Sequence, residues 1–251
     1  MAHELKTAHK IFEVIDVIQK LNTPTLTEVA VELDTPKSTV LNYLRTLEDL
    51  GYVIEEDGQY RLSLQFLDHG MHTKRQLKIA RHTPDVLKQL ASDTDEAAWV
   101  MTEERGYVIG IDKELGPRAV QTTGRIGRHT RFHYHAPGKA MLSAMPEPRA
   151  RGIVEGHGMP AKTSETITDL DALMEQISEF RETGVAFDVG EAIEGLRSVA
   201  APVTSGDGVE GAIAVVGPKN RLRGDRFREE IPDVVAGAAN EIELRLRYED
   251  A

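Results

Sequence analysis

The sequence predicts an α+β protein in which a small helical module precedes a larger domain with an antiparallel sheet. Residues 25–62 show two short amphipathic helices across a tight turn, followed by a hairpin. Residues 97–112 and 198–216 each contain two apolar runs joined by a short turn, which is typical of antiparallel hairpins. Residues 169–183 repeat apolar side chains at helical spacing. We therefore expect a first module over 1–64, a linker helix over 65–80 and a second domain over 81–251.

Composition narrows the class of protein. At 251 residues the chain is long enough for two modest cores. It has no cysteine, which excludes disulfides, thiol nucleophiles and cysteine-bound zinc. No apolar run reaches membrane-spanning length and residues 1–10 lack the apolar region of a signal peptide, so we expect a cytoplasmic protein with no membrane partner. The net charge of −11 argues against a non-specific nucleic-acid binder, because attraction to phosphate needs cations.

Two apolar stripes define the helix-turn-helix. The first follows i, i+3, i+4 and i+7, and the second repeats at helical spacing. Between them, Thr35 is expected to cap the second helix, with Pro36 at its first position and Gly51 just past its end. The hairpin that follows turns at Asp57-Gly58, in the place of the wing of a winged helix-turn-helix. The stripes are Leu26, Val29, Ala30 and Leu33, then Val40, Leu44, Leu47 and Leu50.

The other face of the second helix is polar. In a winged helix-turn-helix this helix is the one that enters the DNA major groove. Its hydroxyl, amide and guanidinium groups have the sizes that reach phosphates and base edges, whereas on an ordinary core helix they would only be solvated. We predict that it contacts double-stranded DNA, with Arg61 of the wing on phosphate. The predicted contact residues are Lys37, Ser38, Thr39, Asn42, Tyr43, Arg45 and Arg61.

This module is itself acidic. Residues 1–75 hold 8 Lys and Arg against 12 Asp and Glu. Specific contact must then depend on a few local cations. The acidic balance suits a salt-rich cytoplasm, where charges are screened within about 3 Å at 1 M salt.

The remaining elements follow from periodicity and turn residues. A helix over 5–21 ends at Asn22-Thr23-Pro24, and the linker helix could be interrupted at Gly70. Later helices are expected at 83–92, 137–144, 148–155 and 169–183, with a last one that begins near Phe227 or Pro232 and ends near Arg247. Strands are expected at 97–102, 107–112, 119–122, 185–188, 198–204 and 209–216.

Three segments follow the winged module and make four with it: His135-Ala-Pro-Gly-Lys-Ala140, then Gly184-Val-Ala-Phe-Asp188 running through Gly195 to Ala200-Ala-Pro-Val203, and Gly211-Ala-Ile-Ala-Val-Val-Gly-Pro218. In this order they resemble the IclR family of transcriptional regulators, over essentially the entire chain. The resemblance implies a linker helix and a GAF-like C-terminal domain that binds a small effector. It also implies homodimers, or dimers of dimers, on palindromic operators. The expected function is a sequence-specific DNA-binding regulator controlled by a catabolic metabolite, without a cofactor and without catalysis.

The resemblance places the effector against the loop before 137–144 and against three strands. It points to His135, Ala136, Pro137, Asp188, Ser198, Ala214 and Val216. Backbone N–H groups near Gly138 are expected to receive a carboxylate, because a helix N-terminus binds anions. Apolar Ala214 and Val216 favour a ligand larger or more apolar than the smallest acids.

Structural roles remain open for three of these residues. His135 could be a hydrogen-bonding residue at the entrance of the helix. Asp188 could cap a loop or pair with Arg125 or Arg128, and Ser198 could be a buried hydroxyl bonded to a carbonyl.

Two other functions stay open at this point. His129, His133 and His135, with His157, Asp188 and Glu191, could serve a metal-responsive regulator if they converge; on a strand, His133 and His135 would share a face. An enzyme is less well supported, since Gly138-Lys139 lacks the context of a phosphate-binding loop and no serine stands in a nucleophile elbow. A scaffold that uses the winged helix for protein contacts is the remaining alternative.

Overall fold

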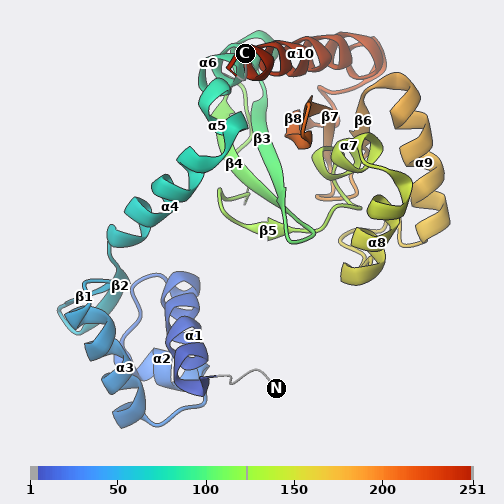
Figure 1. The fold of residues 1–251 in the computed structure, drawn as a ribbon. Helices are drawn as coiled ribbons and strands as arrows, with labels where there is room; N and C mark the ends of the chain where they lie inside the picture. The colour runs from blue at the N-terminus through green and yellow to red at the C-terminus, as the bar shows by residue number, and fades with distance from the viewer. Residues whose placement is uncertain (1–4, 123, 250–251) are drawn as a thin grey trace. The chain divides into compact units, whose positions relative to one another are not determined.

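The computed structural model describes residues 5–122 and 124–249. Internal contacts divide the chain into an N-terminal unit that ends at Thr73 and a C-terminal unit that begins at Lys74. The N-terminal unit consists of α1 (Lys6–Leu21), α2 (Leu26–Glu32), α3 (Lys37–Asp49), β1 (Val53–Glu56), β2 (Gln59–Leu62) and most of α4 (Gln65–Gln76), coloured blue to teal in Figure 1. Within the described residues, no helix is long and apolar enough to cross a membrane.

The predicted winged helix-turn-helix is confirmed. Val14, Val29, Val40 and Leu44 are fully buried where α1, α2 and α3 meet. The side chain of Thr25 caps α2 in a reciprocal capping box with Glu28. β1 and β2 pair antiparallel to form the wing.

Two details of α3 differ from prediction. Pro36, not Thr35, is the N-cap residue, because the Thr35 hydroxyl donates to the Leu33 carbonyl at the end of α2. Leu50 is 64% exposed, since α3 ends at Asp49 and the apolar stripe ends with it. Gly51 has φ +81°, the left-handed conformation expected of a residue just past a helix.

The helix α4 runs through Gly70 without a break, so the interruption considered there is absent.

The C-terminal unit is built on one six-stranded antiparallel sheet, in the order β5-β4-β3-β8-β7-β6. Its strands are β3 (Ala97–Glu104), β4 (Tyr107–Leu115), β5 (His129–Thr130), β6 (Ala186–Asp188), β7 (Leu196–Ser205) and β8 (Gly208–Pro218). Its helices are α5 (Lys78–His82), α6 (Pro84–Thr94), α7 (Ala136–Ala144), α8 (Glu147–His157), α9 (Leu170–Thr183) and α10 (Ile231–Glu249), which a π-helical turn at Arg226–Glu230 precedes.

The strand expected at 119–122 is absent and β5 takes its place beside β4. Residues 116–119 form a turn closed by a hydrogen bond from the Ala119 amide to the Gly116 carbonyl. The guanidinium of Arg221 holds the Arg118 carbonyl at 2.7 Å. After this turn, the Gly127 amide donates to the Gly110 carbonyl of β4 at 2.8 Å, and β5 pairs with β4 at His129 and Thr130.

Helices cover both faces of the sheet (Figure 1). Alternate residues of β8 point to opposite faces: Ile213 and Val215 join a core with α6 and α10, whereas Ala212 and Ala214 join a core with α7 and α9. The small alanines let α7 pack closely on β7 and β8. Gly138 reflects the same crowding, since a Cβ there would lie 2.3 Å from the Phe132 carbonyl oxygen. The N-terminal end of α7 is therefore fixed against the sheet.

Candidate functional site

The predicted DNA-contacting residues of α3 lie on the side opposite its buried stripe. Lys37, Ser38, Asn42 and Arg45 are exposed, and Thr39 and Tyr43 are half-buried at the edges of this face. Val40, Leu44 and Leu47 anchor the other side of the helix in the core. We call the six polar side chains of α3 the recognition face. It offers two cations, hydroxyls and an amide, as groove recognition requires.

Arg61 of the wing is engaged within the wing. Its guanidinium donates two hydrogen bonds to the Glu56 carboxylate, at 2.8 and 3.2 Å. Glu55 accepts from the Gly58 amide at the turn, beside Asp57. Arg61 thus has a carboxylate partner already, and the wing carries three acidic residues in a row, Glu55, Glu56 and Asp57.

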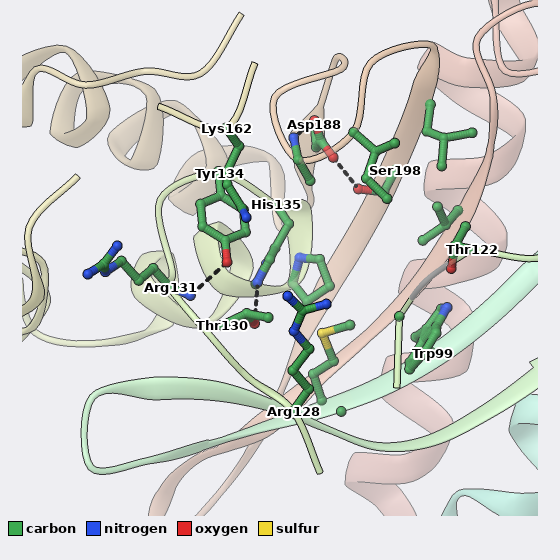
Figure 2. A pocket seen from close by; sticks show the side chains of 18 of the residues that line it. Trp99, Thr122, Arg128, Thr130, Arg131, Tyr134, His135, Lys162, Asp188 and Ser198 are labelled. Atoms are coloured by element: carbon green, nitrogen blue, oxygen red, sulfur yellow. Dashed lines mark hydrogen bonds between the residues drawn. The ribbon is translucent and has the colours of Figure 1, made fainter. Parts of the chain in front are cut away.

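A cavity of about 620 Å³ opens on the C-terminal unit, between β3, β4, β8 and the segment that leads into α7 (Figure 2). His135, Pro137, Asp188, Ser198 and Val216 line it, so the structure brings together five of the residues expected at an effector site. Ala136 and Ala214 do not line it. Both are fully buried in the core between α7 and the sheet.

His135 closes the start of α7. Its Nδ1 accepts a hydrogen bond from the Gly138 amide at 3.0 Å, so the ring proton is on Nε2, which lies 2.9 Å from the Thr130 hydroxyl. Thr130 in turn donates to the Val108 carbonyl at 3.0 Å. Burial lowers the pKa of His135 to about 3, so the ring is neutral. The Gly138 amide, one of the groups expected to receive a carboxylate, therefore already donates to the imidazole.

Asp188 caps the loop that follows β6. Its carboxylate accepts from the Glu191 amide at 2.7 Å, from the Ala192 amide at 3.4 Å and from the Ser198 hydroxyl at 3.2 Å. Its partners are therefore not Arg125 or Arg128, and Ser198 donates to a carboxylate rather than to a carbonyl. Burial raises the pKa of Asp188 to about 6, against its hydrogen bond from Glu191 and the nearby ammonium of Lys139, which lower it.

Behind Asp188 lies a buried ion pair that the sequence reasoning missed. The ammonium of Lys139 is fully buried and donates to Glu191 at 2.5 Å and to Gln176 at 2.9 Å. Burial lowers the pKa of Lys139, and Glu191 opposes this. The sequence feature that could have predicted this pair is Lys139, a lysine among the small and apolar residues of α7. The pair ties α7 and α9 to the loop at 189–195.

The cationic lining of the cavity was also missed. Arg125, Arg128, Arg131 and Lys162 line it, whereas Asp188 is the only acidic residue among the described residues that do so. The three arginines within residues 125–131 are the feature of the sequence that could have predicted this cationic lining. Trp99, Met101, Tyr107 and Tyr134 supply much of the apolar wall.

The histidines have other partners than a metal. His133 Nε2 bonds to the Pro160 carbonyl at 3.1 Å, and both ring nitrogens of His135 are engaged. His129 and His157 each pack against Tyr107, and Glu191 pairs with Lys139, so these residues do not converge as the metal-responsive alternative would require. Among residues 5–122 and 124–249, no group of three or more His, Cys, Asp or Glu side chains is arranged to hold a metal ion.

Comparisons with known proteins agree with this architecture. A model of the IclR helix-turn-helix domain matches residues 7–57, and a model of the bacterial IclR C-terminal domain matches residues 71–244. The chain is 34% identical over 239 residues to the probable HTH-type transcriptional regulator ArcR of Halobacterium salinarum, covering 93% of this chain and 91% of that protein. It is 27% identical to the regulator KdgR of Escherichia coli, covering 96% and 92%.

Solved structures share the fold. The Thermotoga maritima IclR structure aligns with a TM-score of 0.82 at 24% identity, over 97% of this chain and 99% of that one. An IclR homolog from Microbacterium hydrocarbonoxydans, solved in complex with 4-hydroxybenzoate, aligns with a TM-score of 0.79 at 18% identity, over 95% and 99%. With both domain models matched in order and a relative this similar over nearly its full length, the chain belongs to the IclR family of helix-turn-helix transcriptional regulators.

Proposed function

We propose that this regulator reads DNA with the recognition face of α3 and senses a small organic metabolite in the cavity beside α7. This proposal depends on two features of the chain: the exposed polar face of α3, and a cavity of about 620 Å³ whose lining combines apolar side chains with cations, hydroxyls and one carboxylate. That volume lies within the range of ligand sites, roughly 300–1,000 Å³. We infer that the protein acts in the cytoplasm and not as an enzyme.

The DNA-binding form is proposed to be a homodimer or a pair of dimers on a palindromic operator. One recognition helix reads only a few base pairs, so two half-sites about one helical turn apart supply the remaining affinity and specificity. The effector must bind one arrangement of the dimer better than another, since otherwise it shifts no equilibrium.

The proposed effector is a catabolic metabolite larger than the smallest polar acids. The volume and the apolar side chains of Val216 and Trp99 support this choice. The 4-hydroxybenzoate complex of the Microbacterium homolog is a precedent, on the same fold, for a ligand of this size.

The test is DNA binding of the full chain to genomic fragments selected by the wild-type protein, measured by anisotropy at fixed salt. Asn42→Ala and Arg45→Ala are each expected to weaken binding by about 1–3 kcal/mol if the side chain reads a base. Arg228→Ala removes an exposed arginine in the C-terminal unit and serves as the matched control. Unchanged binding by both α3 variants would overturn the assignment of the recognition face. Failure of the wild-type chain to retain any fragment would favour the scaffold alternative.

A further inference from the structure

We propose that the cavity selects a ligand with one negative charge and an apolar body, and that the guanidinium of Arg128 receives the charge. This inference rests on the proposed effector cavity and adds the polarity of its ligand. Four places near the cavity could in principle hold an anionic head group: the start of α7, the ammonium of Lys139, the arginine-rich segment 125–131, and Lys162, whose ammonium already lies over the Tyr134 ring, 5.8 Å from the ring centroid.

The start of α7 is not available. Pro137 has no N–H, and the Gly138 amide donates to His135 Nδ1. The Ala136 backbone is buried in the core and its residue does not line the cavity. The imidazole in front of this helix end is neutral. A carboxylate there would meet a ring nitrogen that already accepts a hydrogen bond, and would find no donor.

Lys139 is not available either. Its ammonium is fully buried, does not line the cavity, and is held by Glu191 at 2.5 Å and Gln176 at 2.9 Å. Moving it to a ligand would leave the Glu191 carboxylate buried without its cation, which costs several kcal/mol. The Lys139 ammonium therefore stabilises the fold through Glu191 and is not free to bind a ligand.

Arg128 meets the requirement. Its side chain reaches into the cavity toward His135 and Thr130, whereas that of Arg131 points away (Figure 2). Across the described residues, the Arg128 guanidinium has no hydrogen bond or ion pair. Its neighbours His135 and Thr130 are neutral and already bonded to each other. A guanidinium offers paired N–H groups that match the two oxygens of a carboxylate.

The opposite end of the cavity sets the limit of one charge. Asp188 lies there with Ser198, and its carboxylate is satisfied by two amides and a hydroxyl (Figure 2). A second anionic group on the ligand would face this carboxylate. The apolar part of the lining includes Trp99, Met101 and Val216. A cation, apolar side chains and a carboxylate in one cavity fit an aromatic monocarboxylate, whose ring would contact this apolar part of the lining.

The test uses the full chain and three probes: benzoate, its neutral analogue benzamide, and the dianion terephthalate. Trp99 is the only tryptophan of the chain and lines the cavity, so its fluorescence reports binding directly. Benzoate is expected to bind about tenfold or more tightly than benzamide, which is the effect of one hydrogen-bonded charge. Terephthalate is expected to bind more weakly than benzoate.

Arg128→Gln is expected to remove the preference for benzoate over benzamide, while Arg228→Gln, a control at an exposed arginine that does not line the cavity, retains it. If Arg128 has only a structural role, Arg128→Gln would weaken the binding of benzoate and of benzamide by the same factor. Lack of benzoate binding by the wild-type chain, equal binding of benzoate and benzamide, or equal effects of the two substitutions would overturn the assignment. If Arg128-dependent binding holds but benzoate leaves DNA affinity unchanged, the regulatory proposal fails and the polarity of the cavity stands.

Discussion

Asp188→Asn should change how the stability of the C-terminal unit responds to pH. The carboxyl is buried and its pKa is raised to about 6 from an ordinary value of 3.8. Between these two values the folded state binds a proton that the unfolded state does not, so this group stabilises the fold as the pH falls from 7 toward 4. Asparagine keeps an oxygen for the Glu191 amide but cannot titrate.

The size of the effect follows from the pKa. Each unit of difference between folded and unfolded states corresponds to about 1.4 kcal/mol. Because pH 5 lies one unit below the folded pKa of about 6, the wild-type chain should gain about 1 kcal/mol between pH 7 and pH 5 from this group. The free energy of unfolding of the wild type minus that of Asp188→Asn should therefore increase by about 1 kcal/mol between pH 7 and pH 5, whatever its value and sign at pH 7.

Urea denaturation at pH 5, 6 and 7 and constant ionic strength measures this difference. Trp99 lies on β3 and follows the C-terminal unit alone. Ser198→Ala is the control, since it removes a hydrogen-bond partner of Asp188 but keeps the titrating carboxyl. A wild-type to Asp188→Asn difference that is independent of pH, or that shrinks on acidification, would refute the buried, proton-binding carboxyl.

Two further predictions concern charge pairs. Lys139→Ala leaves the Glu191 carboxylate buried and unpaired, so we expect a loss of about 3–5 kcal/mol in urea denaturation, partly restored in the Lys139→Met, Glu191→Leu double variant. A loss below about 1 kcal/mol would show that the pair is solvated. Glu56→Gln removes a wing carboxylate and releases Arg61, so DNA affinity should rise severalfold, with a salt slope steeper by about one if Arg61 then neutralises a phosphate. The matched control Glu13→Gln should leave both unchanged.

The fold was largely predictable because its signals are local. The stripes of α2 and α3, the Asp57-Gly58 turn and the helix at Leu170–Thr183 each depend on residues a few positions apart. Errors arose where distant groups decide the outcome. The Arg221 guanidinium, about a hundred residues away in the chain, holds the turn that replaced the expected strand at 119–122.

The candidate site was predictable only in part, for a related physical reason. Asp188 and Ser198 were found through their motifs, since neighbouring strands bring them into register. The role of Arg128 depends on which donors near it are already used. The sequence shows that His135 precedes a helix, but not that its Nδ1 takes the Gly138 amide and thereby excludes an anion there. Which donor and acceptor pair in such a case depends on the three-dimensional arrangement, which a sequence pattern does not show.

The most direct test of regulation by the cavity is the affinity of the full chain for one selected genomic fragment, with and without a saturating ligand. The ligand is first identified by quenching of Trp99 within a panel of aromatic and aliphatic monocarboxylates. We expect bound ligand to change DNA affinity by about 5–150-fold, the usual range of coupling between two sites, and to have no effect on Arg128→Gln at the same concentration. A ligand that saturates the cavity of the wild-type chain and leaves its DNA affinity unchanged would contradict the proposed function.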